Sequence, residues 1–133
     1  MKSIEEQLIK HEGFESKVYH CPAGRLTIGV GRNLEDKGIT REEALYLLRN
    51  DIKECETDLR TIFDNFEEID KIRKNVLIDM RFNLGPSRFR QFKKMIAAVR
   101  KKDFQKALKE MKNSNWYRQV GKRGENLCEM MES

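Results

Sequence analysis

Apolar residues recur along most of this chain at intervals of three and four, the spacing that places them on one side of an α-helix. The pattern predicts a first helix over residues 3–12, a long amphipathic helix over residues 41–60 and a last helix over residues 122–132. Two capping-box pairs mark the starts of the first two helices: Ser3 with Glu6, and Thr40 with Glu43.

Interruptions of the apolar pattern divide the segment between residues 61 and 121 into shorter helices. One apolar face, which stops at the helix-terminating pair Gly85-Pro86, consists of Ile72, Val76, Leu77, Met80 and Leu84. Ser87 is expected to cap the next helix, and Asp103 the one after it. Trp116 and Tyr117 begin a further short helix and are expected to close a C-terminal core.

The segment from Lys17 to Gly31 has a different pattern, with β-branched residues on either side of a turn-like sequence at residues 21–24. It predicts a short antiparallel hairpin. The expected fold is therefore α+β and mostly helical, in a single domain of 133 residues. A small N-terminal lobe with the hairpin, about residues 12–60, leads through a long connecting helix to a helical C-terminal lobe. That second lobe is expected to comprise about residues 61–133 plus helix 1, with a cleft for a polymer substrate between the lobes.

Composition narrows the function classes. Charged residues make up 37% of the chain, and no apolar stretch approaches the roughly 20 residues that span a bilayer, so we expect no membrane span. The acidic N-terminus does not match a secretory signal. The three cysteines lack metal-ligand spacing, so we expect reduced thiols and no metal.

The net charge of +5 and the run Arg100-Lys101-Lys102 raise nucleic-acid binding as one hypothesis. We expect no nucleic-acid partner, because basic and acidic residues alternate and no known motif is present.

The end of the first helix carries a candidate catalytic group. Hydrolysis of a glycosidic bond needs an acid that protonates the leaving oxygen and usually a second group on the other side of the sugar. Glu12 ends the predicted helix, and residues 21 and 27 lie on the hairpin that follows. By itself a glutamate at a helix end is most often a solvated charge.

Several separated strings give Glu12 its context: His11-Glu12-Gly13-Phe14, then Lys17-Val18-Tyr19, then Leu26-Thr27-Ile28-Gly29-Val30-Gly31. Together they resemble the phage lysozymes of glycoside hydrolase family 24. In that family a Glu, a residue nine positions on and a Thr six beyond it form the catalytic triad, which here corresponds to Glu12, Cys21 and Thr27. The resemblance continues through Phe82-Asn83-Leu84-Gly85, Trp116-Tyr117 and Arg123. The short segment from Arg32 to Thr40 indicates a trimmed N-terminal lobe.

The resemblance implies a muramidase that cleaves the β-1,4 linkage between N-acetylmuramic acid and N-acetylglucosamine in peptidoglycan, without a cofactor and as a monomer. Glu12 would be the general acid, and Arg123 the cation that supports it. Thr27 would hold the attacking water, and Phe82 would pack on a sugar ring unless it belongs to the core. A phage or prophage enzyme of this kind would be made in the host cytoplasm and released to the wall at lysis.

Three positions depart from the family pattern, and two glycines indicate close packing. Cys21 stands where the family usually has Asp, so its thiol could be a base, a nucleophile or an inert turn residue. Nearby Lys17, His20 and Arg25 could lower its pKa, and oxidation to a sulfinic acid is a further option. Met95 and Glu110 replace small polar cleft residues. Gly29 and Gly31 suggest close approach of the backbone to substrate or to the first helix. An alternative function is therefore a weakly active or inactive peptidoglycan-binding module.

Overall fold

The structure, a computed structural model, describes residues 3–133 and divides into two compact units. The first unit ends at Leu47, and the second extends from Leu48 to Ser133. The predicted α+β class is confirmed, because helices dominate and the one sheet lies near the N-terminus. The lobe boundaries expected from the sequence stay a prediction.

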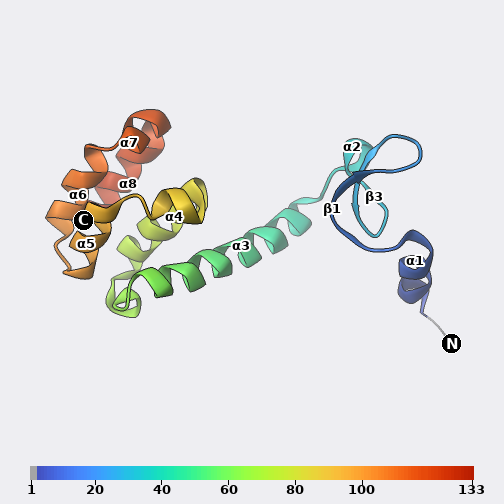
Figure 1. Cartoon of the computed structure of the whole chain (residues 1–133), viewed down its shortest axis with the longest axis horizontal. Helices are drawn as coiled ribbons and strands as arrows, with labels where there is room; N and C mark the ends of the chain where they lie inside the picture. Colours follow the sequence, from blue (N-terminus) through green and yellow to red (C-terminus); the bar gives the residue numbers. More distant parts are fainter. Residues whose placement is uncertain (1–2) are drawn as a thin grey trace. The chain divides into compact units, whose positions relative to one another are not determined.

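The first unit contains one helix, a small sheet and a helical turn (Figure 1). The sheet is antiparallel in the order β1-β2-β3, with Tyr19 opposite Thr27 and Thr27 opposite Asn33. The start of the long helix α3 (Arg41–Ile62) completes the unit. The elements before α3 are α1 (Ile4–Glu12), β1 (Glu15–His20), β2 (Leu26–Gly29), β3 (Arg32–Asn33) and α2 (Leu34–Lys37).

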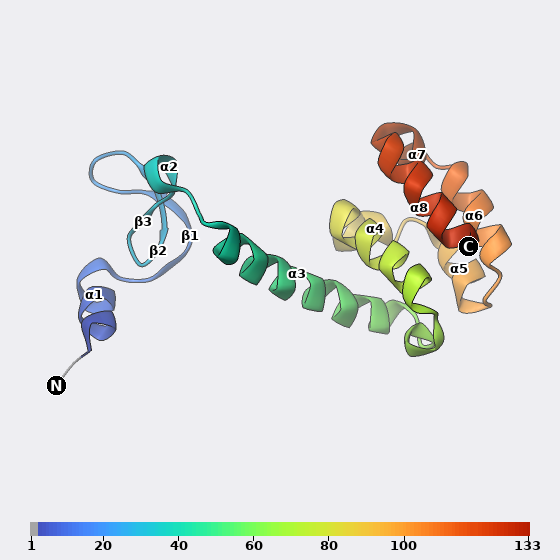
Figure 2. The same ribbon diagram turned by 180° about the vertical axis from the view of Figure 1, so that it is seen from behind.

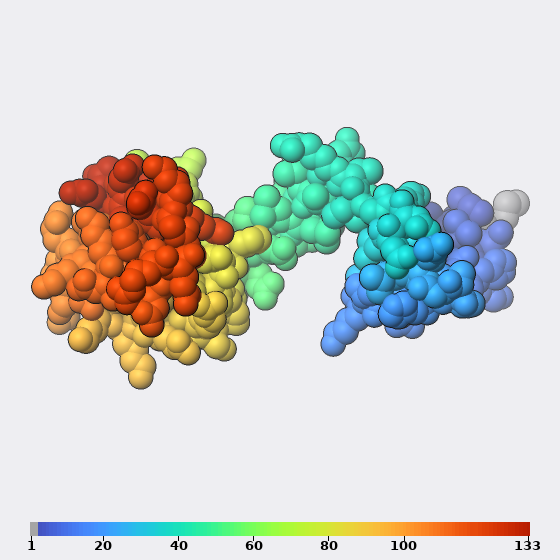
Figure 3. Space-filling model, turned by 90° about the horizontal axis from the view of Figure 1, so that it is seen from above, coloured from blue at the N-terminus to red at the C-terminus, as the bar shows by residue number. Residues whose placement is uncertain are grey.

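The second unit is a helical body around an apolar core. Figures 1 and 2 show α8 beside α4, α6 and α7, and Figure 3 shows these side chains as one closely filled body. Its elements after α3 are the 3₁₀ turn η1 (Phe66–Glu68), α4 (Lys71–Phe89), α5 (Lys93–Arg100), α6 (Phe104–Lys112), α7 (Asn115–Val120) and α8 (Lys122–Glu132). Fully enclosed core side chains include Leu59, Phe63, Met80, Phe89, Met95, Met111 and Met131.

Most predicted helix starts are confirmed by their capping bonds. The Ser3 hydroxyl accepts the Glu6 N–H at 3.1 Å. At the start of α3 the Thr40 hydroxyl accepts the Glu43 N–H at 3.1 Å, and Glu43 accepts the Thr40 N–H at 2.8 Å, which is the full capping box. Asp103 caps α6 by accepting the N–H of Lys106 at 3.1 Å.

The expected hairpin is confirmed as β1 and β2, and the polar pair Arg32–Asn33 adds a third strand that the sequence pattern did not predict. One local prediction was wrong. Ser87 does not cap α5, which begins at Lys93 without a side-chain cap. Gly85, at φ +82°, does break the helical geometry as expected, but one more helical turn follows through Phe89.

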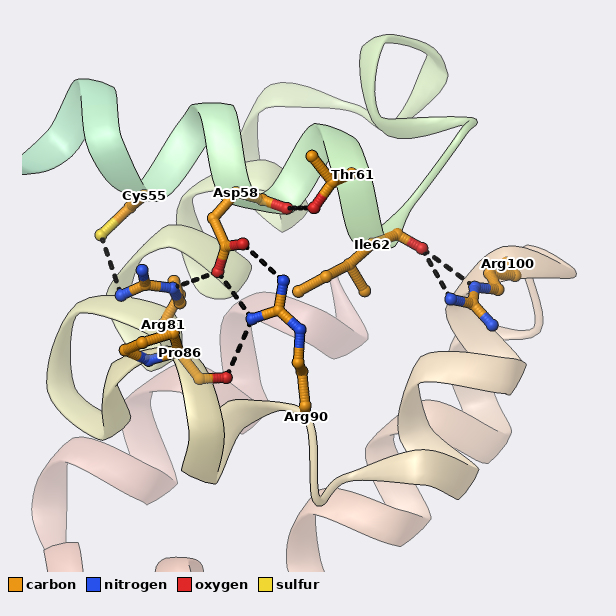
Figure 4. A network of polar contacts seen from close by, with 8 residues as sticks. All are labelled: Cys55, Asp58, Thr61, Ile62, Arg81, Pro86, Arg90 and Arg100. Atoms are coloured by element: carbon orange, nitrogen blue, oxygen red, sulfur yellow. Dashed lines mark hydrogen bonds and ion pairs between the residues drawn. The ribbon is translucent and has the colours of Figure 1, made fainter.

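A shared carboxylate joins α3 to α4 inside the second unit (Figure 4). Asp58 accepts from Arg81 at 2.7 Å and from Arg90 at 2.5 and 2.9 Å. The Arg90 guanidinium beside it is the first reason that the pKa of Asp58 falls to about 2. Arg81 is only 6% exposed, so Asp58 partners a guanidinium that is largely shielded from water.

Within residues 3–133, no helix combines the length and the apolar character that a membrane span requires.

Candidate active site

Glu12 is the last residue of α1, where the chain turns toward the sheet. The helix closes at Gly13, whose N–H donates to the Ile9 carbonyl at 2.7 Å. The Glu12 side chain lies against Gly31 in the turn between β2 and β3, so close that a Cβ at Gly31 would stand 2.9 Å from Oε2. Gly31 also has φ +64°, which favours glycine. The predicted close approach is thus confirmed for Gly31, whereas nothing lies within 4 Å of a Cβ at Gly29.

Cys21 begins the tight turn between β1 and β2. Its N–H donates to the Arg25 carbonyl at 3.0 Å, and its carbonyl accepts the Gly24 N–H at 2.8 Å. The backbone N–H of Arg25 is the main cause that holds the pKa of the Cys21 thiol below its ordinary value, against a smaller opposing effect of desolvation. The backbone N–H groups of Ala23 and Gly24 act in the same direction. The turn therefore stabilises a thiolate at this position.

Thr27, on β2, is the neighbour of Cys21 that the spacing had predicted. Its side chain is among the groups that lower the pKa of the Cys21 thiol, and the residue is only 2% exposed. The Thr27 hydroxyl donates to the Arg25 carbonyl at 2.8 Å. One hydroxyl proton cannot serve that carbonyl and the Cys21 sulfur at once, so the lowering of the Cys21 pKa requires the hydroxyl to turn from the carbonyl to the thiolate. In either case the lone pairs of the Thr27 oxygen can accept a hydrogen bond from water.

The predicted cationic cause of a lowered Cys21 pKa is not the one found. The Arg25 guanidinium pairs with Glu35 at 2.9 Å and with Asp36 at 3.5 Å, on α2. Neither Lys17 nor His20 is among the groups that shift the thiol. Backbone N–H groups replace the expected side-chain charges because a tight turn directs several of them toward one point.

An arginine-glutamate pair fixes the far edge of the sheet. Arg32 of β3 donates to both carboxylate oxygens of Glu43, at 3.0 and 2.5 Å, and to the Gly38 carbonyl at 3.0 Å. The Arg32 hydrogen bonds are the first cause that lowers the pKa of Glu43 to about 2, and the Thr40 N–H adds to them. This connection holds β3 to the start of α3, and with it the turn that contacts Glu12.

Two further predicted site residues lie in the second unit. Arg123 of α8 pairs with Asp79 of α4, with both Nε and Nη2 within 2.8 Å of the same carboxylate oxygen. Its expected role beside Glu12 stays a prediction. Phe82 of α4 is 45% exposed, so it is not a core residue of this unit, and its role in sugar binding also stays a prediction.

The second unit also holds a pocket of about 540 Å³. Met95 and Glu110, the two departures from small polar cleft residues, both line it. Trp116 lines it as well and is held by its indole N–H, which donates to Asn83 at 3.0 Å. As predicted, Trp116 is buried. Sequence reasoning missed this pocket because residues from four helices form it and no local motif signals their convergence.

The model of the phage lysozyme family matches residues 9–130. The chain belongs to the phage lysozyme family. The match extends over both units and includes Glu12, Cys21, Thr27, Phe82 and Arg123.

Two relatives in Dictyostelium discoideum carry the name probable T4-type lysozyme. Probable T4-type lysozyme 1 is 28% identical to this phage lysozyme family member over 165 positions, with all of this chain and 95% of the relative covered. Probable T4-type lysozyme 2 is 27% identical, with the same coverage. Both alignments are longer than the 133 residues of this chain, so these relatives have residues that it lacks.

A third relative is the pre-baseplate central spike protein Gp5 of Enterobacteria phage T4. It is 25% identical over 146 positions that cover 89% of this chain but only 25% of the spike protein. The relatives of this chain therefore include part of a larger protein. Family membership indicates a lysozyme-like glycoside hydrolase.

The residues 3–133 contain no group of three or more His, Cys, Asp or Glu side chains arranged to hold a metal ion. All three cysteines are free thiols, with Cys55 and Cys128 buried and Cys21 partly exposed.

Proposed function

We propose that this chain is a muramidase that hydrolyses the β-1,4 linkage between N-acetylmuramic acid and N-acetylglucosamine of bacterial peptidoglycan. The observation that carries the proposal is the position of the Glu12 carboxyl group. It lies against Gly31 in the turn between β2 and β3, and the turn between β1 and β2 of the same sheet holds Cys21 beside Thr27. Membership of the phage lysozyme family supports the same reaction.

Glu12 acts as the general acid in this mechanism. It transfers its proton to the glycosidic oxygen as the bond from that oxygen to the anomeric carbon breaks. Positive charge develops on the sugar ring, and a nucleophile must then form a new bond to the anomeric carbon. The Glu12 carboxylate that remains can accept a proton from water in a later step.

Cys21 supplies the second group in one of two ways. As a base, its thiolate takes a proton from water while the water oxygen bonds to the anomeric carbon, and the configuration inverts. As a nucleophile, its sulfur bonds to that carbon directly, and water then hydrolyses the carbon-sulfur bond with retention. The backbone N–H groups that lower the Cys21 pKa support both routes, since each needs the thiolate.

Thr27 positions the water. Its hydroxyl oxygen accepts a hydrogen bond from the attacking water, while its proton is donated to the Arg25 carbonyl or to the Cys21 thiolate. Arg123 and Phe82 are proposed to support Glu12 and to pack on a sugar ring. The protein would work as a monomer in phage-type lysis, after synthesis in the host cytoplasm and release to the wall.

Product analysis on purified peptidoglycan tests the proposal. Wild-type protein is expected to release fragments with reducing muramic acid ends, and Glu12→Gln is expected to release none while keeping its folded circular dichroism. Glu5→Gln removes an exposed carboxylate from the same helix and is the matched control, with activity near that of wild type. Undiminished turnover by Glu12→Gln, or anhydro ends in the products, would contradict the mechanism.

A second candidate function is a wall-binding module without turnover, which the cysteine at position 21 favours. Sedimentation with cell-wall fragments and loss of turbidity are measured on the same folded sample. Binding without clearing identifies the module, and binding with clearing identifies the muramidase.

A further inference from the structure

A second, smaller hollow of the second unit lies between the end of α3 and the helix α5. Its volume is about 290 Å³, and the cations Arg90, Lys93 and Arg100 converge on it. Its apolar floor includes Ile62 and Ile96, which are nearly buried. The complete lining consists of Thr61, Ile62, Arg90, Lys93, Ile96 and Arg100, and so contains no carboxylate from the described residues.

Two of the cations are held in place before any ligand arrives. The Arg100 guanidinium donates twice to the Ile62 carbonyl, at 3.0 and 2.8 Å. Arg90 is held by Asp58 and by the Pro86 carbonyl, the latter at 3.0 Å (Figure 4). Because these side chains are already ordered, binding an anion costs less conformational entropy than it would at a free arginine.

The cluster also has an excess of positive charge. Asp58 is shared by Arg81 and Arg90, so one carboxylate faces two guanidinium groups. Arg100 is held by a neutral carbonyl, which leaves its charge uncompensated and three of its five N–H donors free of that bond. Lys93 adds a third cation at the rim. An anion with several oxygen acceptors matches this arrangement better than a single carboxylate does.

We propose that this hollow binds a phosphate group, which Arg100 contacts through its remaining donors and Lys93 contacts through its ammonium group. The phosphate is either free or part of an anionic phosphodiester polymer of the cell wall. The polymer source rests on the proposed function, whereas the phosphate site itself does not. Lys93 also lines the 540 Å³ pocket, so a polymer phosphate bound here lies next to that pocket.

Nuclear magnetic resonance of the full chain tests the site. Inorganic phosphate is titrated at constant ionic strength, set with chloride, while the side-chain Nε–H signals of Arg90 and Arg100 are followed. Saturable shifts of both signals are expected. Lys93→Gln, at an exposed position without a described bond, is expected to weaken binding about tenfold, near the lower end of the effect of one charge-assisted hydrogen bond.

Lys101→Gln is the matched control, because it removes the same charge from an exposed position outside the hollow. Arg100→Lys keeps the charge but loses the planar fork, and is expected to weaken binding as well. Shifts that do not saturate, or equal weakening by Lys93→Gln and Lys101→Gln, would overturn the phosphate site.

Two polymers separate the sources. Poly(glycerol phosphate) is expected to bind more tightly per phosphate than inorganic phosphate if the wall polymer is the ligand, and equally if the site takes free phosphate. Polyglutamate that binds as tightly as poly(glycerol phosphate) would overturn selectivity for phosphate. Because binding is measured without turnover, an inactive protein with an intact phosphate site would count against the muramidase proposal alone.

Discussion

The two units of this protein are stabilised in different ways. In the described part of the first unit, residues 3–47, Thr27 is the one buried residue, and large apolar side chains such as Phe14 (68%) and Ile4 (63%) are exposed. The second unit encloses an extensive apolar core. The first unit is instead specified by caps, glycine turns and arginine-carboxylate pairs. The candidate catalytic triad thus lies where local polar geometry, not core packing, sets the positions.

Removal of a core aromatic should show this contrast most strongly. Phe63 is fully buried, and its ring packs edge-to-face on that of Phe89 with the two ring centroids 6.4 Å apart. Phe63→Ala is expected to lower the free energy of unfolding of the second unit by about 3–5 kcal/mol. Fluorescence of Trp116, the sole tryptophan, reports that unit during denaturant unfolding.

Phe14→Ala is the counterpart in the first unit. Because Phe14 is mostly exposed, a change within about 0.5 kcal/mol is expected. Equal losses for the two variants would show that the apolar surface of the first unit is covered in solution, and the contrast between the units would fail.

Substitution of Cys21 should affect activity rather than stability, because its environment is a local turn. Cys21→Ser has no accessible anion at neutral pH and is expected to lose about a hundredfold in turnover if the thiolate is base or nucleophile. Cys21→Asp restores an ionised group and is expected to equal or exceed wild type.

The anomeric configuration of the product separates the two roles of the thiolate. Retention together with a trapped saccharide on the protein identifies a nucleophile, and inversion identifies a base. If Cys21→Ser turns over as fast as wild type, the thiol is a bystander.

Acid should weaken the second unit through Asp58. Its pKa of about 2 lies below the ordinary value of 3.8, so its contribution to stability is present above about pH 4 and is lost as the pH falls through about 2. This contribution to the free energy of unfolding is about 2 kcal/mol. Asp58→Asn is expected to remove this amount at pH 7 and to flatten the acid limb of the curve measured by Trp116 fluorescence.

Glu43→Gln provides the comparison in the first unit. The pKa of Glu43 is also about 2, but 39% of its side chain is exposed. Solvent screening reduces its contribution, so a smaller loss than that of Asp58→Asn is expected. A loss as large as that of Asp58→Asn would contradict the importance of burial.

The smallest expected loss of turnover is at Gly31. A methyl group there meets the flexible end of Glu12, so Gly31→Ala displaces the carboxyl group without filling a core. A loss of about tenfold in turnover is expected, since small misplacement of a catalytic group costs rate. Gly38→Ala has nearly the same positive φ, +65°, but meets nothing within 4 Å, and so controls for backbone strain. Equal losses in both variants would separate Gly31 from the site.

How far the sequence predicts this site depends on the range of the interactions. The pairing of Cys21 with Thr27 was predictable, because the two residues are six positions apart across one tight turn. The cause of the lowered Cys21 pKa was not predictable. It depends on the directions of backbone N–H groups in the turn. The Arg25 side chain, one of the expected causes, is instead paired with Glu35.

The sequence by itself determined the helix starts at Ser3, Thr40 and Asp103, the break at Gly85 and the resemblance that located Glu12, because these are properties of neighbouring residues. Only the tertiary structure decided the third strand, the sharing of Asp58 by two arginines, and the two hollows of the second unit. Each of these joins residues that are distant in the chain or lack a periodic signal. Their positions follow from packing and long-range hydrogen bonds, which no local pattern contains.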